Sequence, residues 1–121
     1  MIRTITIQMS EAERRLLIVL NQVFEIEKKL CLHGDPSNLA RNINRIKDVM
    51  EELTFFYENP MGQDFQETRT DLEATISGRG TEGLKVVEVI KPIIRVGQRN
   101  LSRVVQKGIV VVEAANEAKE E

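Results

Sequence analysis

The stretch that decides the fold is LKVVEVIKPIIRVGQRNLSRVVQKGIVVV, residues 84–112. It consists of short β-branched runs that are separated by Pro92, by a polar turn and by Gly108. β-Branched residues favour strands, whereas proline and glycine interrupt them. Together with the alternating segment LEATI at 72–76, this stretch predicts a small antiparallel β-sheet lobe over residues 60–113.

The residues upstream of that lobe follow a different period. Their apolar side chains recur every three or four positions, which is typical of amphipathic helices. Ser10 and Glu13 have the capping-box spacing, so a first helix is expected to begin there, and the His-Gly pair at 33–34 predicts its end. The segment Asp-Pro-Ser at 35–37 predicts the start of a second helix, which is expected to continue to Tyr57.

Each of these two helices has a broad apolar stripe, and packing the two helices against each other would leave part of both stripes uncovered. The short connection predicts an antiparallel helical hairpin over residues 10–59, and two copies of it would bury both stripes. The sequence therefore predicts an α+β fold, in which the hairpin dimerises as a four-helix bundle and the small sheet lobe follows. The expected dimer interface consists of heptad positions of both helices: Leu16, Val19, Val23, Ile26, Leu30, Leu39, Ile43, Ile46, Met50 and Leu53.

The two ends of the chain differ from its middle. Residues 1–9 alternate and predict a short strand or arm, while residues 114–121 are small and charged and predict a flexible tail. No apolar stretch is long enough for a membrane helix, the start lacks a signal-peptide pattern, and the single cysteine excludes an internal disulfide. These observations predict a cytoplasmic protein.

Charge is unevenly distributed along the chain. The formal net charge is −2, yet residues 85–107 contain six bases and one acid. All aromatic residues lie at or before Phe65, so the basic region has none on which nucleic-acid bases could stack. This region is therefore expected to face an acidic protein surface or simply water, and nucleic acid is the less favoured alternative.

No catalytic, cofactor-binding or metal-binding residues are expected. The glycines at 78–83 have the G-x-G-x-x-G spacing, but a strand rather than a helix follows them. Cys31 and His33 are the only cysteine and histidine, which predicts neither a metal site nor a nucleophilic triad. The carboxylates at 64–73 predict a charge network rather than acid–base catalysis. We therefore expect a protein that is not an enzyme.

The sheet region resembles GrpE, the dimeric nucleotide exchange factor of Hsp70 chaperones. VVEVIK (86–91) with VGQR (96–99) is similar to a strand and turn of that family, and RVVQKGIVVV (103–112) is similar to its final strand. GQDF (62–65) and the strand around Ala74 are similar to its G-x-x-F-D-P and H-x-A regions. The resemblance covers residues 37 to 113 of a divergent sequence, truncated relative to the family because the long N-terminal helical stalk is missing.

The resemblance implies a co-chaperone that binds the nucleotide-binding domain of an Hsp70-type ATPase and promotes ADP release without a cofactor. It also implies a partner-facing sheet surface made of Arg95, Val96, Gln98, Arg99 and Arg103. Two alternatives stay open. One is a non-enzymatic dimeric adaptor or assembly factor that binds another protein, and the other is a nucleic-acid binder that uses the basic sheet face.

Overall fold

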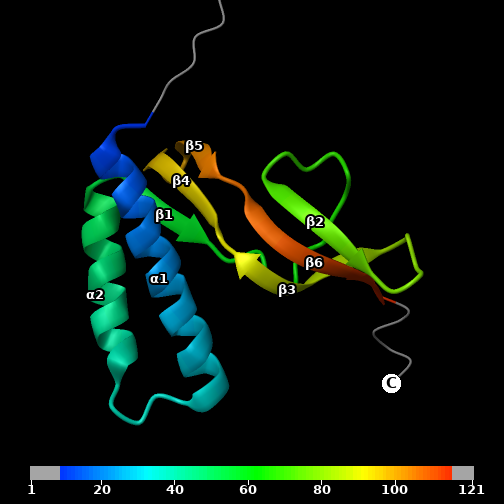
Figure 1. Cartoon of the computed structure of the whole chain (residues 1–121), viewed down its shortest axis with the longest axis horizontal. Coiled ribbons are helices and arrows are strands. Elements are labelled where there is room, and N and C mark those ends of the chain that lie inside the picture. Colours follow the sequence, from blue (N-terminus) through cyan, green and yellow to red (C-terminus); the bar gives the residue numbers. More distant parts are fainter. Residues whose placement is uncertain (1–8, 116–121) are drawn as a thin grey trace, which may run out of the picture.

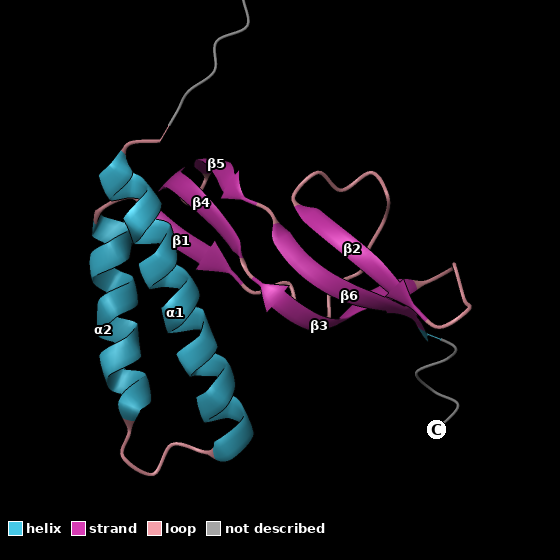
Figure 2. Ribbon diagram, in the orientation of Figure 1, coloured by secondary structure: helices cyan, strands magenta, loops and turns pink. Residues whose placement is uncertain are grey.

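The computed structural model describes residues 9–115 and shows two helices followed by six strands (Figure 1). The elements are α1 (Glu11–His33), α2 (Leu39–Glu52), β1 (Phe55–Glu58), β2 (Leu72–Ser77), β3 (Leu84–Lys91), β4 (Ile93–Gln98), β5 (Leu101–Gln106) and β6 (Gly108–Ala114). The strands form a first sheet of order β1-β4-β5 and a second sheet of order β2-β6-β3. Both helices lie at one end of the molecule, and the second sheet extends away from them (Figure 2).

Helix α1 begins and ends where the sequence predicts. The Ser10 hydroxyl accepts the N–H of Glu13, and the Glu13 carboxylate accepts the N–H of Ser10, both at 3.1 Å. At the other end Gly34 has a φ of +85°, and its N–H donates to the carbonyl of Leu30 at 2.8 Å. This left-handed conformation suits glycine and ends the helix.

Helix α2 is shorter than the sequence predicts. It starts under the carboxylate of Asp35, which accepts the N–H groups of Leu39 and Ala40. It ends at Glu52 because Thr54 has a left-handed φ of +68°, which turns the chain out of the helix. The following Phe-Phe-Tyr-Glu segment forms β1 and pairs antiparallel with β4. The apolar spacing that predicted a longer helix therefore extends into residues that form a strand.

The predicted architecture is wrong, although the α+β class agrees with the structure. The helices do not form a hairpin bundle, since α1 has 23 residues and α2 has 14. The strands are far more than a small lobe, because they hold as many residues as the helices. The sheet is not wholly antiparallel either, since β2 pairs parallel with β6. The physical reason is that the helices bury side chains against strands of the same chain, rather than keeping them for a second hairpin.

Two long arms connect the sheets. β3 continues into β4 across Pro92, and β5 continues into β6 across Lys107. Proline has no N–H to donate to a neighbouring strand, so the ladder is interrupted there and the chain passes from one sheet into the other. The two arms pair antiparallel in both sheets, with Ile94 opposite Gln106 and Lys91 opposite Ile109. They form one ribbon, which β1 flanks at one end and β2 at the other.

Two hydrophobic clusters form the core, and α1 contributes to both. Leu20 packs with Met50, Phe55 and Ile94 over the first sheet. Phe24, one turn further along α1, packs with side chains of the second sheet. Tyr57 contacts both clusters, and its ring meets that of Phe24 edge to face at 5.8 Å. Helix α1 is thus fixed across the junction of the two sheets.

The predicted termini lie largely outside the described residues. Of the arm expected at 1–9, only Met9 is described, and it packs against the cluster around Leu20. Of the tail expected at 114–121, Ala114 belongs to β6 and is buried. No helix in residues 9–115 is long and apolar enough to cross a membrane.

Candidate functional site

The partner-facing residues implied by the resemblance lie on the hairpin β4–β5, but they differ in exposure. Gln98 ends β4 and is exposed, while Val96 is half-buried and packs against the cluster around Leu20. Arg95 is held inside an ion-pair network, with its side chain 22% exposed. Arg95 and Val96 therefore serve the fold first, and only the outer part of the hairpin is open to a partner.

The network around Arg95 ties the sheets together. Its guanidinium donates to Glu58 at 2.8 Å and to Asp71 at 3.4 Å. Arg69 makes two further hydrogen bonds of 2.9 Å to Asp71. These bonds, first of all those from Arg69, lower the pKa of Asp71 below its ordinary value and raise that of Arg69. Asp71 is one of the carboxylates at 64–73 that the sequence predicts to form a charge network, and it pairs with both arginines here.

The turn of the hairpin is anchored to the helical end of the molecule. Arg99 donates to both carboxylate oxygens of Glu51, at 2.8 and 3.3 Å, and its guanidinium lies 4.8 Å from the centre of the Phe56 ring. The hydrogen bond from Arg99 lowers the pKa of Glu51. The N–H of Gly97 also donates to the carbonyl of Thr54 at 2.8 Å. Contacts at Gly97 and Arg99 therefore hold the turn end of the hairpin in place.

An exposed leucine, Leu101, begins β5 and is not among the residues that the sequence predicts as partner-facing. Leu101 is 82% exposed, which is the largest value among the exposed large hydrophobic residues of the described chain. It pairs with Gln98 across the turn and is followed by Arg103, which is exposed on the same strand. In the sequence, the sign of this exposed residue is a single leucine within the polar stretch 98–103, since apolar side chains are uncommon at hairpin turns.

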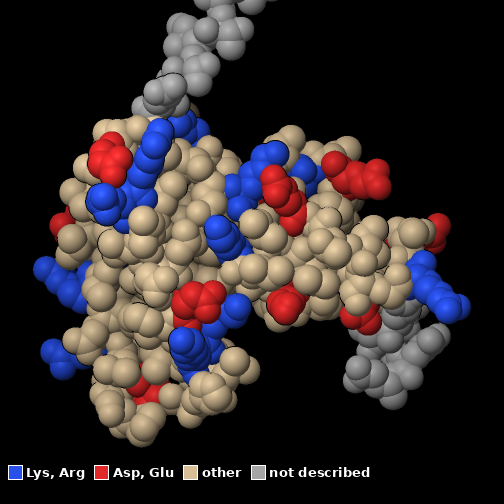
Figure 3. All heavy atoms as spheres, in the orientation of Figure 1, with Lys and Arg blue, Asp and Glu red and all other residues tan. Residues whose placement is uncertain are grey.

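Half of the bases in the basic region of the sequence are paired with acids in three dimensions. Three of its six bases pair with acids from elsewhere: Lys85 with Asp64, Arg95 with Glu58 and Asp71, and Arg99 with Glu51. On the face shown in Figure 3, basic and acidic side chains are interspersed over the strands. A phosphate backbone binds best to a continuous row of bases, so this arrangement disfavours the nucleic-acid alternative.

The residues predicted as a dimer interface divide between the inside and the outside of the chain. Val23, Ile43 and Met50 are buried within it, and Leu16 and Leu30 are half-buried. The others are 40 to 52% exposed: Val19, Ile26, Leu39, Ile46 and Leu53. The exposed residues on each helix are spaced by seven, so they share one side of that helix. Both helices therefore carry apolar side chains that residues 9–115 leave exposed.

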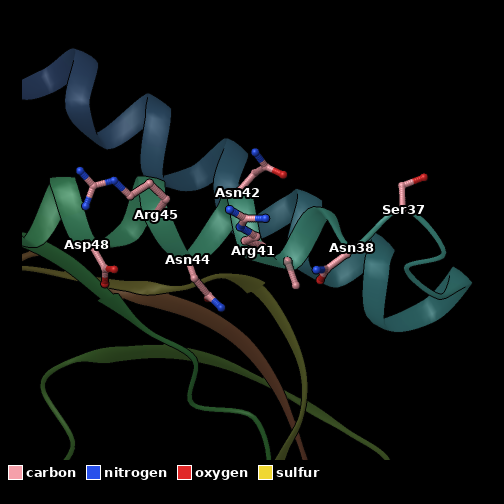
Figure 4. Close-up of a pocket in the computed structure, with 8 residues that line it drawn as sticks. Ser37, Asn38, Arg41, Asn42, Asn44, Arg45 and Asp48 are labelled. Carbon is pink, nitrogen blue, oxygen red and sulfur yellow. The ribbon is translucent and has the colours of Figure 1, made fainter.

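An open hollow of the surface runs along α2. Its lining is polar and consists of Ser37, Asn38, Ala40, Arg41, Asn42, Asn44, Arg45 and Asp48. Figure 4 shows that the labelled side chains spread out in different directions along the helix. They do not converge on one point, so the hollow offers no built ligand site. In residues 9–115 no group of three or more His, Cys, Asp or Glu side chains is placed to hold a metal ion.

Comparison with known proteins found no matching family model, no similar curated protein and no similar solved structure.

Proposed function

We propose that this protein is a cytoplasmic, non-enzymatic regulator that binds the nucleotide-binding domain of an Hsp70-type ATPase and promotes ADP release, as GrpE does. The observation that carries the proposal is the anchored β4–β5 hairpin, which presents Leu101 between Arg99 and Arg103. The sequence resemblance falls on these same strands and on their partners in the second sheet.

The chemistry of the hairpin fits a protein partner. A large apolar side chain beside arginines is a common composition of the residues that dominate binding energy in interfaces. The bonds of Arg99 to Glu51 hold the turn before the partner arrives, so less conformational entropy is lost on binding. The complementary surface is an apolar pocket for Leu101 with carboxylates at its rim for Arg103.

The proposed mechanism needs no reacting side chain. A nucleotide-binding domain that opens and closes around ADP releases it faster when a partner binds the open form more tightly. The size of the acceleration is then limited by the difference in affinity between the two forms. The hairpin supplies that difference if its contact surface is complete only in the open form.

The test is the release of a fluorescent ADP analogue from each Hsp70-type ATPase of the host, followed by stopped-flow fluorescence. The unaltered protein is expected to accelerate release. Leu101→Asp is expected to weaken the interaction by about tenfold or more, which corresponds to at least ~1.4 kcal/mol. Arg103→Glu is expected to slow association and to make the rate less sensitive to salt.

Arg41→Glu is the matched control, because Arg41 is an exposed base on α2 outside the hairpin. It should accelerate release as well as the unaltered protein does. The proposal fails if saturating unaltered protein accelerates release from none of the host ATPases. It also fails if Leu101→Asp and Arg103→Glu behave like the control.

We also propose that two copies associate through the helix sides that carry Val19, Ile26 and Ile46. The supporting observation is that these residues are 40 to 42% exposed, although the same helices bury other apolar residues in the core. Apolar side chains aligned on one side of a helix suit packing against a second helix. A dimeric adaptor of another pathway would share this property, so the nucleotide-release experiment is what separates the two functions.

A further inference from the structure

A second candidate site lies away from the hairpin, in a groove between the C-terminal half of α1 and strand β3. Its volume is about 480 Å³, a size typical of ligand sites. Phe24 and Leu32 of α1 line one wall, Val87 and Val89 of β3 line the other, and Met61 lies between β1 and β2 in the sequence. Leu32 and Met61 are 77% and 55% exposed, so large apolar side chains border the groove.

The strand that lines this groove has an open edge. β3 is an outer strand of the second sheet, and the segment 62–65 covers only its first half, with hydrogen bonds at Leu84 and Val86. Beyond Val86, no strand of residues 9–115 pairs with this edge. The carbonyl of Val89 accepts a hydrogen bond from Lys28 Nζ of α1 at 3.0 Å. An open edge pairs with an extended backbone, so the edge selects a peptide strand as the occupant.

One lysine of the groove is available to a side chain of that peptide. The lining contains two lysines, Lys28 and Lys47, and two glutamates, Glu27 and Glu88. Lys47 is paired with Glu27 at 3.2 Å, whereas the ion pair of Lys28 with Glu25 is long, at 3.9 Å. A peptide N–H that replaces Lys28 at the Val89 carbonyl frees the ammonium group. A carboxylate on the peptide can then bind this ammonium group, while a large apolar side chain fills the space beside Phe24.

Tyr57 is a further polar residue of the groove lining. It lines the groove, and its hydroxyl oxygen is buried without a hydrogen-bond partner in the described part of the chain. Buried hydroxyl groups are usually bonded, and an unbonded one costs stability.

We propose that this groove binds an extended peptide of a partner protein by strand addition to β3, with a large apolar residue in the groove and an acidic residue at Lys28. None of the residues used here belongs to the β4–β5 hairpin. The inference therefore goes beyond the contact with the ATPase and stands or falls separately from it.

Two natural probes report on this groove. Tyr57 is the only tyrosine of a chain without tryptophan, so intrinsic fluorescence near 300 nm comes from this residue. Cys31 is the only cysteine, is exposed and lines the groove, so its reaction rate with a thiol reagent measures access. A peptide in the groove should change the tyrosine emission and slow the thiol reaction several-fold.

The experiment begins with selection of random twelve-residue peptides, displayed on phage, against the full-length protein. The expected peptides alternate apolar residues and carry a Glu or Asp next to them. A synthetic copy of the best peptide is then titrated while both probes are followed. Met61→Asp should abolish the response, whereas Leu101→Asp, an equally polar change at an exposed leucine of the hairpin, should leave it intact.

Lys28→Met tests the role assigned to the ammonium group, with Lys29→Met as the matched control. The unaltered protein and Lys29→Met should bind the acidic peptide several-fold more tightly than its Gln version, and Lys28→Met should bind both equally. The proposal is overturned if no peptide is selected. The hydrogen bond from Lys28 to Val89 would then only cover the open edge of β3. The proposal is equally overturned if the selected peptides leave both probes unchanged, or bind Met61→Asp as well as the unaltered protein.

Discussion

Asp71 is the carboxylate on which two arginines converge. Arg69 and Arg95 both donate to it, and its side chain is only 18% exposed. Because these hydrogen bonds hold its folded-state pKa below the unfolded value, the carboxylate stabilises the fold above about pH 4, the ordinary range for Asp. That contribution is lost as the pH falls through the lowered folded-state pKa.

Asp71→Asn is therefore expected to destabilise the protein at pH 7 and to matter less in acid. The loss at pH 7 is expected to be about 1.5–3 kcal/mol, since two partly buried guanidinium groups lose a charged acceptor. The difference between variant and unaltered protein should begin to shrink as the pH falls below about 4, where the unfolded chain is protonated first, and should vanish once the pH has passed the lowered folded-state pKa. Urea unfolding at several pH values measures both effects. Glu73→Gln, an exposed change on β2, is the control and should show neither effect.

Gly108 has a steric role rather than a conformational one. A Cβ at this position would lie 2.8 Å from Leu72 Cδ2 and 3.0 Å from Ile93 Cγ1, and both side chains are buried. Gly108→Ala is therefore expected to cost about 1–3 kcal/mol of unfolding free energy through overpacking. If the clash is the cause, adding Leu72→Val should recover part of the loss in thermal unfolding. Purely additive effects of the two changes would contradict this explanation.

At the scale of elements, one pair of amides attaches α1 to the first sheet. Asn21 Nδ2 donates to Gln106 Oε1 at 2.9 Å, and Gln106 Nε2 donates back to Asn21 Oδ1 at 3.0 Å. The same Nε2 also donates to the carbonyl of Pro92, where the two sheets separate. The pair thus fixes the helix at the point where the ribbon passes between sheets.

Removing either amide is expected to cost about 1 kcal/mol, because the remaining partner is left without its hydrogen bond. A double-mutant cycle with Asn21→Ala and Gln106→Ala should show a coupling of about 0.5–1.5 kcal/mol. Chemical denaturation of the four proteins gives this number. Gln98→Ala, at an exposed glutamine of β4, is the control for glutamine removal. A coupling near zero would mean that side-chain packing alone positions α1.

Local signals explain which elements could be predicted from the sequence. The capping box at Ser10 and the glycine at 34 act on their own neighbours, so both ends of α1 were predictable. The end of α2 was not, since Phe56 and Tyr57 continue the helical spacing while pairing with β4. That pairing depends on residues about 40 positions away, so the spacing of apolar residues near the end of α2 cannot reveal it.

The sequence also does not reveal which strands pair or which charges meet, because these partners lie far apart along the chain. Alternation in β2 predicts a half-buried strand, but it does not reveal a parallel neighbour such as β6. The run of bases predicted a charged surface, yet Arg95 and Arg99 meet their acids only after folding. Of the candidate site, the sequence therefore indicated the strands that carry it, but not which of their side chains remain open.

At the scale of the whole molecule, Ile46→Asp tests self-association. Ile46 is 40% exposed in the single chain, so the change should alter folding stability little. In a dimer it would place a charge in an apolar contact, and sedimentation should then show monomer where the unaltered protein shows dimer. Asn42→Asp on the same helix makes the same change of charge at an exposed polar position and should keep the dimer. An unaltered protein that is a folded monomer at micromolar concentration would rule out self-association.

The ribbon formed by β3–β4 and β5–β6 also bears on how the molecule opens. Each sheet takes two of its three strands from this ribbon, so neither sheet can lose its central strand without pulling on the other. Backbone amides of β4 and β6 should therefore exchange their hydrogens for deuterium in a single rare event, whereas those of β2, which is held by β6 alone, should exchange sooner. Native-state exchange at increasing denaturant distinguishes this behaviour from separate opening of the sheets. Because two arms of the chain run from one sheet into the other, the two hydrophobic clusters are expected to unfold as one cooperative unit. A force applied at the hairpin turn is then transmitted along these arms to the second sheet.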